Sequence, residues 1–166
     1  MELTVGATVI YPHHGAAQVQ TIEDKTIRGE KRQYATLKVL DSDLVIQVPI
    51  DNVNTVGIRE VSDAEQLARV FAVLQQQDVE EPSNWSRRFK ANNEKLTSGD
   101  VIKIAEVIRD LTRRDENKKL SAGEKRMLNQ ARQILASEVA LARGLDEPGA
   151  ETLLDHVLAG EDPDSL

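Results

Sequence analysis

The stretch Ser62-Asp63-Ala64-Glu65-Gln66-Leu67 marks the point where the periodicity of the sequence changes. On its N-terminal side apolar residues alternate with polar ones, and on its C-terminal side they recur every three or four residues. Ser62 and Glu65 have the spacing of a capping box, whose side chains accept hydrogen bonds from free backbone N–H groups at a helix start. The sequence therefore predicts a β domain before this stretch and a helical domain that begins with it.

Four short runs before Ser62 are typical of strands, because β-branched residues alternate there with polar ones. A fifth candidate strand lies around residues 56–58. The four runs are separated by turn signals and comprise Thr8–Tyr11, Ala17–Ile22, Tyr34–Leu40 and Leu44–Val48. Short strands at this spacing predict a small, strongly bent sheet that closes toward a barrel. We expect this domain to span residues 1–54 and a linker to occupy residues 55–61.

The remaining residues, 62–166, follow the helical repeat and predict a bundle of about five helices. A second capping box, Ser121-Ala122-Gly123-Glu124, opens a long helix that should end at Gly144. An earlier helix should begin near residues 83–86, directly after a proline, and run to about Thr97. The predicted fold class is α+β, with a small N-terminal β-barrel followed by a C-terminal helical bundle.

The composition excludes several classes of protein. With 40% hydrophobic but only 3% aromatic residues, the cores must be mostly aliphatic. The chain has no cysteine, so it cannot use disulfides or thiolate chemistry, and this fits a reducing cytoplasm. No apolar run approaches about 18 residues, and the first 12 residues lack the features of a secretory signal. We expect a cytoplasmic protein that does not bind a membrane.

The net charge of −7 is unevenly distributed along the chain. Residues 83–133 contain 13 Lys or Arg and 7 Asp or Glu, a net charge of +6, whereas residues 134–166 contain 1 and 8. Local fields steer a charged partner more than the total charge does. Because Arg87, Arg88, Lys90 and Lys125 all belong to the basic block, the charge pattern favours contact with nucleic acid.

Catalysis and metal binding are not expected. The only histidines are His13, His14 and His156, and a zinc site needs three or four converging ligands. No nucleophile, base and oxyanion donor cluster in the sequence, and no glycine-rich phosphate loop is present. We predict a protein that is not an enzyme and has no cofactor.

Trp85 can be interpreted in two ways. In a helix that starts near Ser83 it shares a face with Phe89 and Leu96, which is ordinary core spacing, and aromatic rings are usually buried. It also lies in the first helical turn beside a proline-containing loop, where a ring can project from the surface. The positive end of the helix would then attract phosphate. The pattern alone leaves both interpretations open.

Four segments of this chain together resemble the CarD (CdnL-type) bacterial transcription regulators, and the likeness is strongest to actinobacterial members. These segments follow the family's order and are Val9–Ala17, Glu81–Asn92, Leu120–Leu128 and Ala131–Leu135. The resemblance extends over essentially the whole chain, and the segment around Trp85 is the most specific part of it.

The resemblance implies a Tudor-like β domain that binds the RNA polymerase β subunit and a helical domain that contacts promoter DNA. Trp85 would wedge into the minor groove at the upstream edge of the transcription bubble and stabilise the open complex. Basic contacts to DNA would come from Arg87, Lys90 and Lys125. A monomer is expected.

The polymerase surface implied by the resemblance comprises Lys25, Thr26, Ile27 and Gln47. Two of these residues depart from the actinobacterial pattern, which has arginines where this chain has Lys25 and Gln47. Lysine keeps the charge but loses the planar fork of arginine, and glutamine loses the charge. The alternative function is a protein-interaction adaptor in which Trp85 is part of the core and DNA is not contacted.

Overall fold

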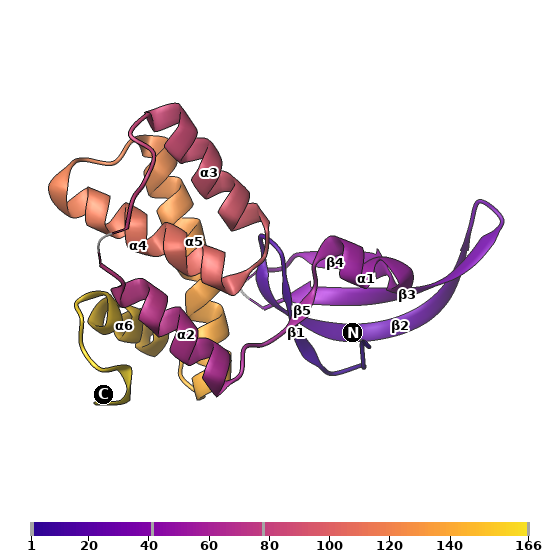
Figure 1. Cartoon of the computed structure of the whole chain (residues 1–166). Coiled ribbons are helices and arrows are strands. Elements are labelled where there is room, and N and C mark those ends of the chain that lie inside the picture. The colour runs from indigo at the N-terminus through magenta and orange to yellow at the C-terminus, as the bar shows by residue number, and fades with distance from the viewer. Residues whose placement is uncertain (1, 41, 78, 166) are drawn as a thin grey trace. The chain divides into compact units, whose positions relative to one another are not determined.

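The computed structural model describes residues 2–40, 42–77 and 79–165, and the chain divides into two compact units (Figure 1). The first unit is Met1–Val61 and the second is Ser62–Leu166. The first is a sheet and the second a helical bundle, so the change of periodicity at Ser62 coincides with the change of architecture.

The first unit is a five-stranded antiparallel sheet with the strand order β4-β3-β2-β1-β5. Its elements are β1 (Thr8–Tyr11), β2 (Gly15–Ile27), β3 (Glu30–Val39), β4 (Val45–Pro49), the 3-10 turn η1 (Ile50–Asn52), helix α1 (Val53–Val56) and β5 (Arg59–Glu60). The core is entirely aliphatic, and its buried residues are Val9, Ala17, Val19, Ala35, Leu37, Val39, Val48, Val53 and Ile58.

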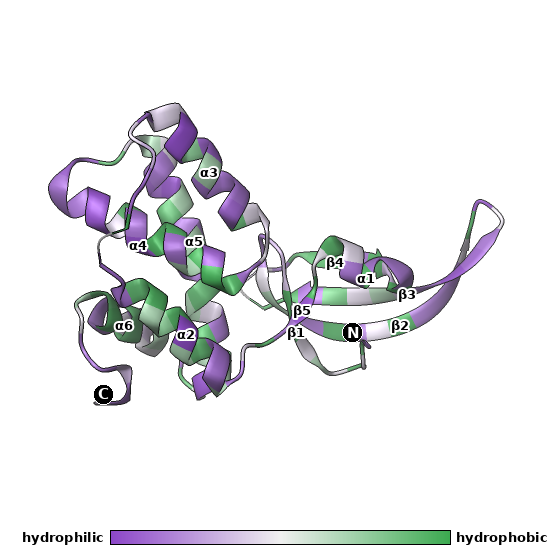
Figure 2. Cartoon of the chain, viewed as in Figure 1, coloured by the Kyte–Doolittle hydropathy of each residue, from purple (hydrophilic) through white to green (hydrophobic). Residues whose placement is uncertain are grey.

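Strands β2 and β3 form a hairpin whose far end projects beyond the rest of the sheet (Figure 1). Arg28 and Gly29 form its turn with φ angles of 54° and 81°, the left-handed conformation that a tight two-residue hairpin turn requires. Side chains near this turn are mostly exposed, and the strands are correspondingly polar there (Figure 2). The strand predicted to end at Ile22 therefore continues to Ile27, held by the backbone ladder rather than by a core.

Residues 55–61, which we expected to form a linker, contain regular structure. This segment contains the end of α1 and the strand β5, whose Arg59 and Glu60 pair with Ile10 and Val9 of β1. The fifth strand was expected at residues 56–58, but Gly57, with φ 94°, ends α1 there and turns the chain toward the sheet. Pairing with β1, a long-range contact, decides where this strand lies.

The second unit contains five helices in its described residues, as the apolar periodicity predicts. They are α2 (Ala64–Gln75), α3 (Trp85–Thr97), α4 (Val101–Asn117), α5 (Ala122–Arg143) and α6 (Glu147–Leu158), followed by the 3-10 turn η2 (Pro163–Ser165). The apolar faces of these helices turn inward (Figure 2). The largest fully buried side chains of this core are aliphatic, and they include Leu74, Ile108, Leu111, Leu135 and Leu154.

The capping box predicted at Ser62 is wrong, whereas the one at Ser121 is confirmed. Asp63 caps α2 by accepting a hydrogen bond from the backbone N–H of Gln66. Ser62 instead donates from its N–H and its hydroxyl to the fully buried carboxylate of Glu138, at 2.8 and 2.5 Å. A buried carboxylate without donors is costly, so Ser62 serves that distant group while its neighbour caps the helix.

The α+β class, a β unit followed by a helical bundle, is confirmed. Within the described part of the chain, no helix combines the length and the apolar character that crossing a membrane requires.

Candidate functional site

The first turn of α3 presents Trp85 at the surface. Asn84 caps this helix by accepting a hydrogen bond from the N–H of Arg87, so Trp85 is the first helical residue. Its side chain is 47% exposed and stacks on Phe89, with 5.0 Å between ring centroids and 19° between planes. Residues four apart on a helix are neighbours, so the second ring supports the first. Trp85 is therefore not a core residue.

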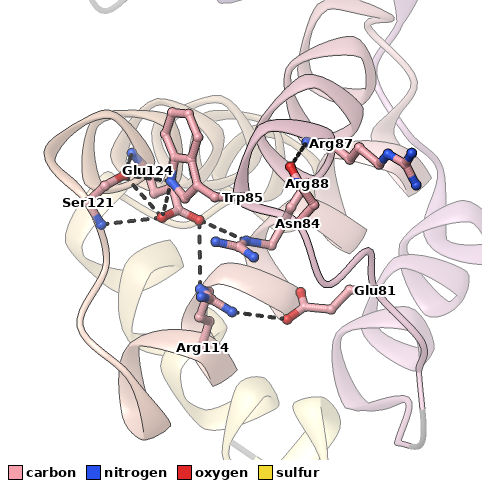
Figure 3. A network of polar contacts seen from close by, with 8 residues as sticks. All are labelled: Glu81, Asn84, Trp85, Arg87, Arg88, Arg114, Ser121 and Glu124. Carbon is pink, nitrogen blue, oxygen red and sulfur yellow. Dashed lines mark hydrogen bonds and ion pairs between the residues drawn. The ribbon is translucent and has the colours of Figure 1, made fainter.

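The polar edge of the indole is held by a buried carboxylate, that of Glu124 (Figure 3). Trp85 Nε1 donates to Glu124 Oε1 at 3.1 Å, and it also lies 3.4 Å from the hydroxyl of Ser121. Ser121 donates to the same Glu124 oxygen from its hydroxyl at 3.0 Å and from its N–H at 3.3 Å. The capping box that starts α5 thus also orients the tryptophan of α3.

Two arginines neutralise Glu124 from the other side (Figure 3). Arg88 Nε lies 3.2 Å from Glu124 Oε2, and Arg114 Nε of α4 lies 3.9 Å from it. Arg114 also pairs with Glu81, at 3.5 Å, in the segment before α3. We call this set the Glu124 cluster; its members are Glu81, Trp85, Arg88, Arg114, Ser121 and Glu124.

Glu124 remains ionised despite its burial. Burial by itself would raise the pKa of this carboxyl, but hydrogen bonds from Ser121 and Arg88 and the charge of Arg88 outweigh it and lower the pKa below its ordinary value. Near neutral pH the site therefore contains a negative charge, 2% exposed, that faces the indole N–H. A charged acceptor makes a stronger hydrogen bond than a neutral one.

The charge pattern predicts that Arg88 contacts DNA, but in the structure this residue is part of the buried Glu124 cluster. The residue is only 2% exposed, and its guanidinium is turned toward Glu124. One turn of helix has 3.6 residues, so Arg87 and Arg88 lie about 100° apart around α3. Arg87 faces solvent and points away from the Glu124 cluster (Figure 3), whereas Arg88 supports it.

The other three predicted basic residues are accessible. Arg87 and Lys90 are exposed on α3, and Lys125 is exposed in the first turn of α5, directly after Glu124. Because Trp85 Nε1 bonds to Glu124, the starts of α3 and α5 lie together. Exposed cations therefore lie on both of the helices whose first turns meet at Trp85.

Gly123 allows α5 to approach the aromatic pair. A Cβ atom at this position would lie 3.1 Å from Phe89 Cε2, closer than most such contacts. The glycine inside the second capping box thus leaves room for the ring on which Trp85 stacks. The sequence indicated neither this contact nor the role of Glu124 beyond capping.

The predicted polymerase residues lie on two strands of the sheet unit. Lys25, Thr26 and Ile27 end β2, while Gln47 lies on the outermost strand β4 and pairs with Thr36. Side chains alternate between faces, so Lys25 and Ile27 share a face and Thr26 points to the opposite one. Following the register through β3 places Gln47 on the face of Lys25 and Ile27. Three of the four residues can therefore meet one partner surface.

Comparison with known protein families covers both units. The model described as "CarD, C-terminal domain" matches residues 69–155, and "CarD-like/TRCF RID domain" matches residues 3–62. The chain belongs to the CarD family. The second description denotes an RNA polymerase-interacting domain, so this CarD-family chain is a transcription regulator with such a domain at residues 3–62, and its β unit has the Tudor-like fold.

Two individual proteins are similar to this chain. A candidate transcription factor of Bacillus subtilis (strain 168), YdeB, is 33% identical over 143 residues, which span 86% of this CarD-family chain and 94% of YdeB. The solution NMR structure of the 72-residue N-terminal domain of Myxococcus xanthus CarD is 32% identical. The match covers 36% of this chain and 79% of that domain, with a TM-score of 0.32.

The histidines of this CarD-family chain are divided between the two units. His14 lies beside Tyr11, at 5.7 Å between ring centroids, and His156 pairs with Glu161 in the other unit. Among the described residues, no group of three or more His, Cys, Asp or Glu side chains is placed to hold a metal ion.

Proposed function

We propose that this CarD-family regulator binds the RNA polymerase β subunit through its sheet unit and contacts promoter DNA through its helical unit. Trp85 enters the minor groove at the upstream edge of the bubble and stabilises the open complex. The observation that carries this proposal is that Trp85 is 47% exposed yet held in place by Phe89 and Glu124.

Physical chemistry supports a wedge at this position. An apolar ring inserted between base steps holds them unstacked, and it is most effective when the protein does not have to order the ring on binding. The positive end of α3 and the exposed Arg87, Lys90 and Lys125 favour phosphates on either side of the ring.

Because the sheet unit binds the polymerase, the contact of the helical unit with DNA can be weak. A chain with net charge −7 is not expected to bind DNA tightly by itself, whereas a protein contact raises the local concentration of the helical unit near the promoter. Lys25, Ile27 and Gln47 supply that contact from one face of the sheet, whereas Thr26 points to the opposite face. Because Gln47 lacks the charge of arginine, this contact is weaker here than in members with an arginine.

The alternative, a protein-interaction adaptor whose Trp85 is buried, is disfavoured by the exposure of the ring. An adaptor would also have no need for exposed cations on both helices whose first turns meet at Trp85.

The test is the lifetime of open complexes challenged with competitor DNA. Trp85→Ala should lose on the order of 1–3 kcal/mol of stabilisation, by analogy with base–aromatic stacking. Leu141→Ala is the matched control, because Leu141 is also a large exposed apolar residue of this unit, at 40%. An unchanged open-complex lifetime in a folded Trp85→Ala protein would refute the insertion of Trp85 into the minor groove.

A further inference from the structure

The buried carboxylate of Glu124 accepts donors from parts of the chain that are distant in sequence. Its two oxygens accept from Ser121 of the same capping box, from the indole of Trp85 and from Arg88. Trp85 lies 39 residues and Arg88 36 residues before it. A helix cap needs only the local partner, so the two contacts from α3 require a separate explanation.

The indole has one polar atom, and its partner determines how the ring can turn. Stacking on Phe89 restrains the plane of the ring, but it does not select between the two orientations that a half-turn about the Cβ–Cγ bond would exchange. A hydrogen bond from Nε1 to Glu124 removes this freedom, since it directs the N–H edge toward α5. The opposite, purely apolar edge is then the one turned away from Glu124.

We propose that Glu124 is a positioning residue for Trp85: its carboxylate holds the ring in the orientation that inserts into DNA before the DNA arrives. This inference rests on the proposed function for its effect on promoters, but the anchoring itself concerns the free protein. Arg88 and Arg114 contribute to this positioning, because their positive charges offset the cost of burying the Glu124 carboxylate.

The free protein offers a direct test, because Trp85 is the only tryptophan of the chain. Time-resolved fluorescence anisotropy reports motion of the ring on the nanosecond scale. In Glu124→Gln the ring should gain a fast component of motion that the wild-type protein lacks. Glu106→Gln is the matched control, because Glu106 also holds a partly buried ion pair, with Lys95 at 2.8 Å, away from Trp85. Identical decays in Glu124→Gln and wild type would overturn the anchoring.

Glu124→Asp keeps the test decisive if Glu124→Gln fails to fold. Aspartate preserves the charge opposite Arg88 but withdraws the carboxylate by one methylene from the indole N–H. This variant should fold and show the same added ring motion. A folded Glu124→Asp protein with wild-type anisotropy would count against the proposal.

A double-mutant cycle separates positioning from a general structural role. Trp85→Phe keeps an aromatic ring but removes the N–H, so Glu124 has nothing left to hold. Glu124→Gln should shorten the open-complex lifetime on the order of fivefold in the wild-type background and have no effect in the Trp85→Phe background. Equal shortening in both backgrounds would mean that Glu124 acts through the fold of α5 alone, and the proposal would be wrong.

Failure of the proposed function would look different. If Trp85→Ala leaves the lifetime unchanged while Glu124→Gln still frees the ring, the anchoring holds and the wedge does not. If Trp85→Ala shortens the lifetime but Glu124→Gln frees the ring without shortening it, the wedge holds and positioning by Glu124 is refuted.

Discussion

The two surfaces to which we assign partners differ in how their side chains are supported. Around Trp85, groups from three helices converge on one buried carboxylate. Along the far half of the β2–β3 hairpin, most side chains from Glu23 to Lys31 are exposed, and the backbone ladder rather than a core orders the two strands. A wedge needs one fixed orientation, whereas a strand surface can adjust to its partner. Preorganisation is therefore concentrated where binding would otherwise have to order a large ring.

The largest expected effect comes from breaking the support of the helical unit. Arg88→Ala leaves the buried Glu124 with its hydrogen bonds from Ser121 and Trp85 but with the longer Arg114 contact in place of the close ion pair, and it should cost about 3 kcal/mol of unfolding free energy. Arg32→Ala is the matched change in the sheet unit, where the pair with Asp51 is partly exposed and a loss of at most about 1 kcal/mol is expected. Urea denaturation monitored by the helical circular dichroism signal measures the loss of stability in Arg88→Ala. The same denaturation monitored by a sheet-specific probe measures the loss in Arg32→Ala. Equal losses would remove the contrast between the two regions.

Acid should weaken the same support. Because the pKa of Glu124 is lower in the folded protein than in the unfolded chain, ionised Glu124 stabilises the fold above the unfolded pKa. This stabilisation is lost as the pH falls through the folded pKa. The urea midpoint of wild type should therefore fall toward that of Glu124→Gln on acidification, while the two stay well separated near neutral pH. A constant separation between them down to pH 3 would contradict the lowered pKa.

Trp85 and Ile27 compare the two surfaces at nearly equal exposure, 47% and 49%. Trp85→Ala removes a stacked and hydrogen-bonded ring and should cost about 1–2 kcal/mol of stability. Ile27→Ala should stay within about 0.5 kcal/mol, because nothing packs the hairpin end into a core. Calorimetry should instead show that Ile27→Ala weakens binding to a β-subunit fragment of the polymerase, and that Trp85→Ala does not. If Trp85→Ala weakened this binding and Ile27→Ala did not, the polymerase would bind the surface around Trp85 and not the sheet surface.

Gln47→Arg should strengthen binding of the polymerase to the sheet unit. An arginine can bind a carboxylate of the partner through two parallel hydrogen bonds, and a gain of about 1 kcal/mol is the scale for a partly exposed contact. Titration of the same polymerase fragment measures it, with Gln33→Arg as a control, because Gln33 of β3 is exposed on the sheet face opposite that of Gln47. No gain from Gln47→Arg would remove this residue from the polymerase surface.

The smallest effects are expected at the exposed lysines. Lys90→Ala and Lys125→Ala should each lower the salt slope of DNA binding by roughly 1 and weaken binding equally on unrelated sequences. Folding stability should change by no more than about 0.5 kcal/mol. Titrations at several salt concentrations provide the slope, and an unchanged slope would assign both residues to ordinary solvated surface.

Local chemistry made much of the fold predictable from the sequence. The change from a period of two to a period of 3.6, the turn at Arg28-Gly29 and the capping box at Ser121 each depend on residues within a few positions of one another. The charge pattern and the family resemblance named the accessible cations Arg87, Lys90 and Lys125, but the charge pattern also included Arg88, which is buried. The position of Trp85 could not be predicted from spacing alone, because a core helix and a surface helix share its pattern.

Packing between segments far apart in the chain decided the rest. Ser62 is 76 residues from Glu138, and that contact, rather than its own capping motif, determines its role. Trp85 and Arg88 reach Glu124 across more than thirty positions. Because of these contacts, Trp85 is a supported ring at the surface and Arg88 is a buried counter-charge. A buried carboxylate must find donors wherever the fold brings them, and no local periodicity encodes which donors those are.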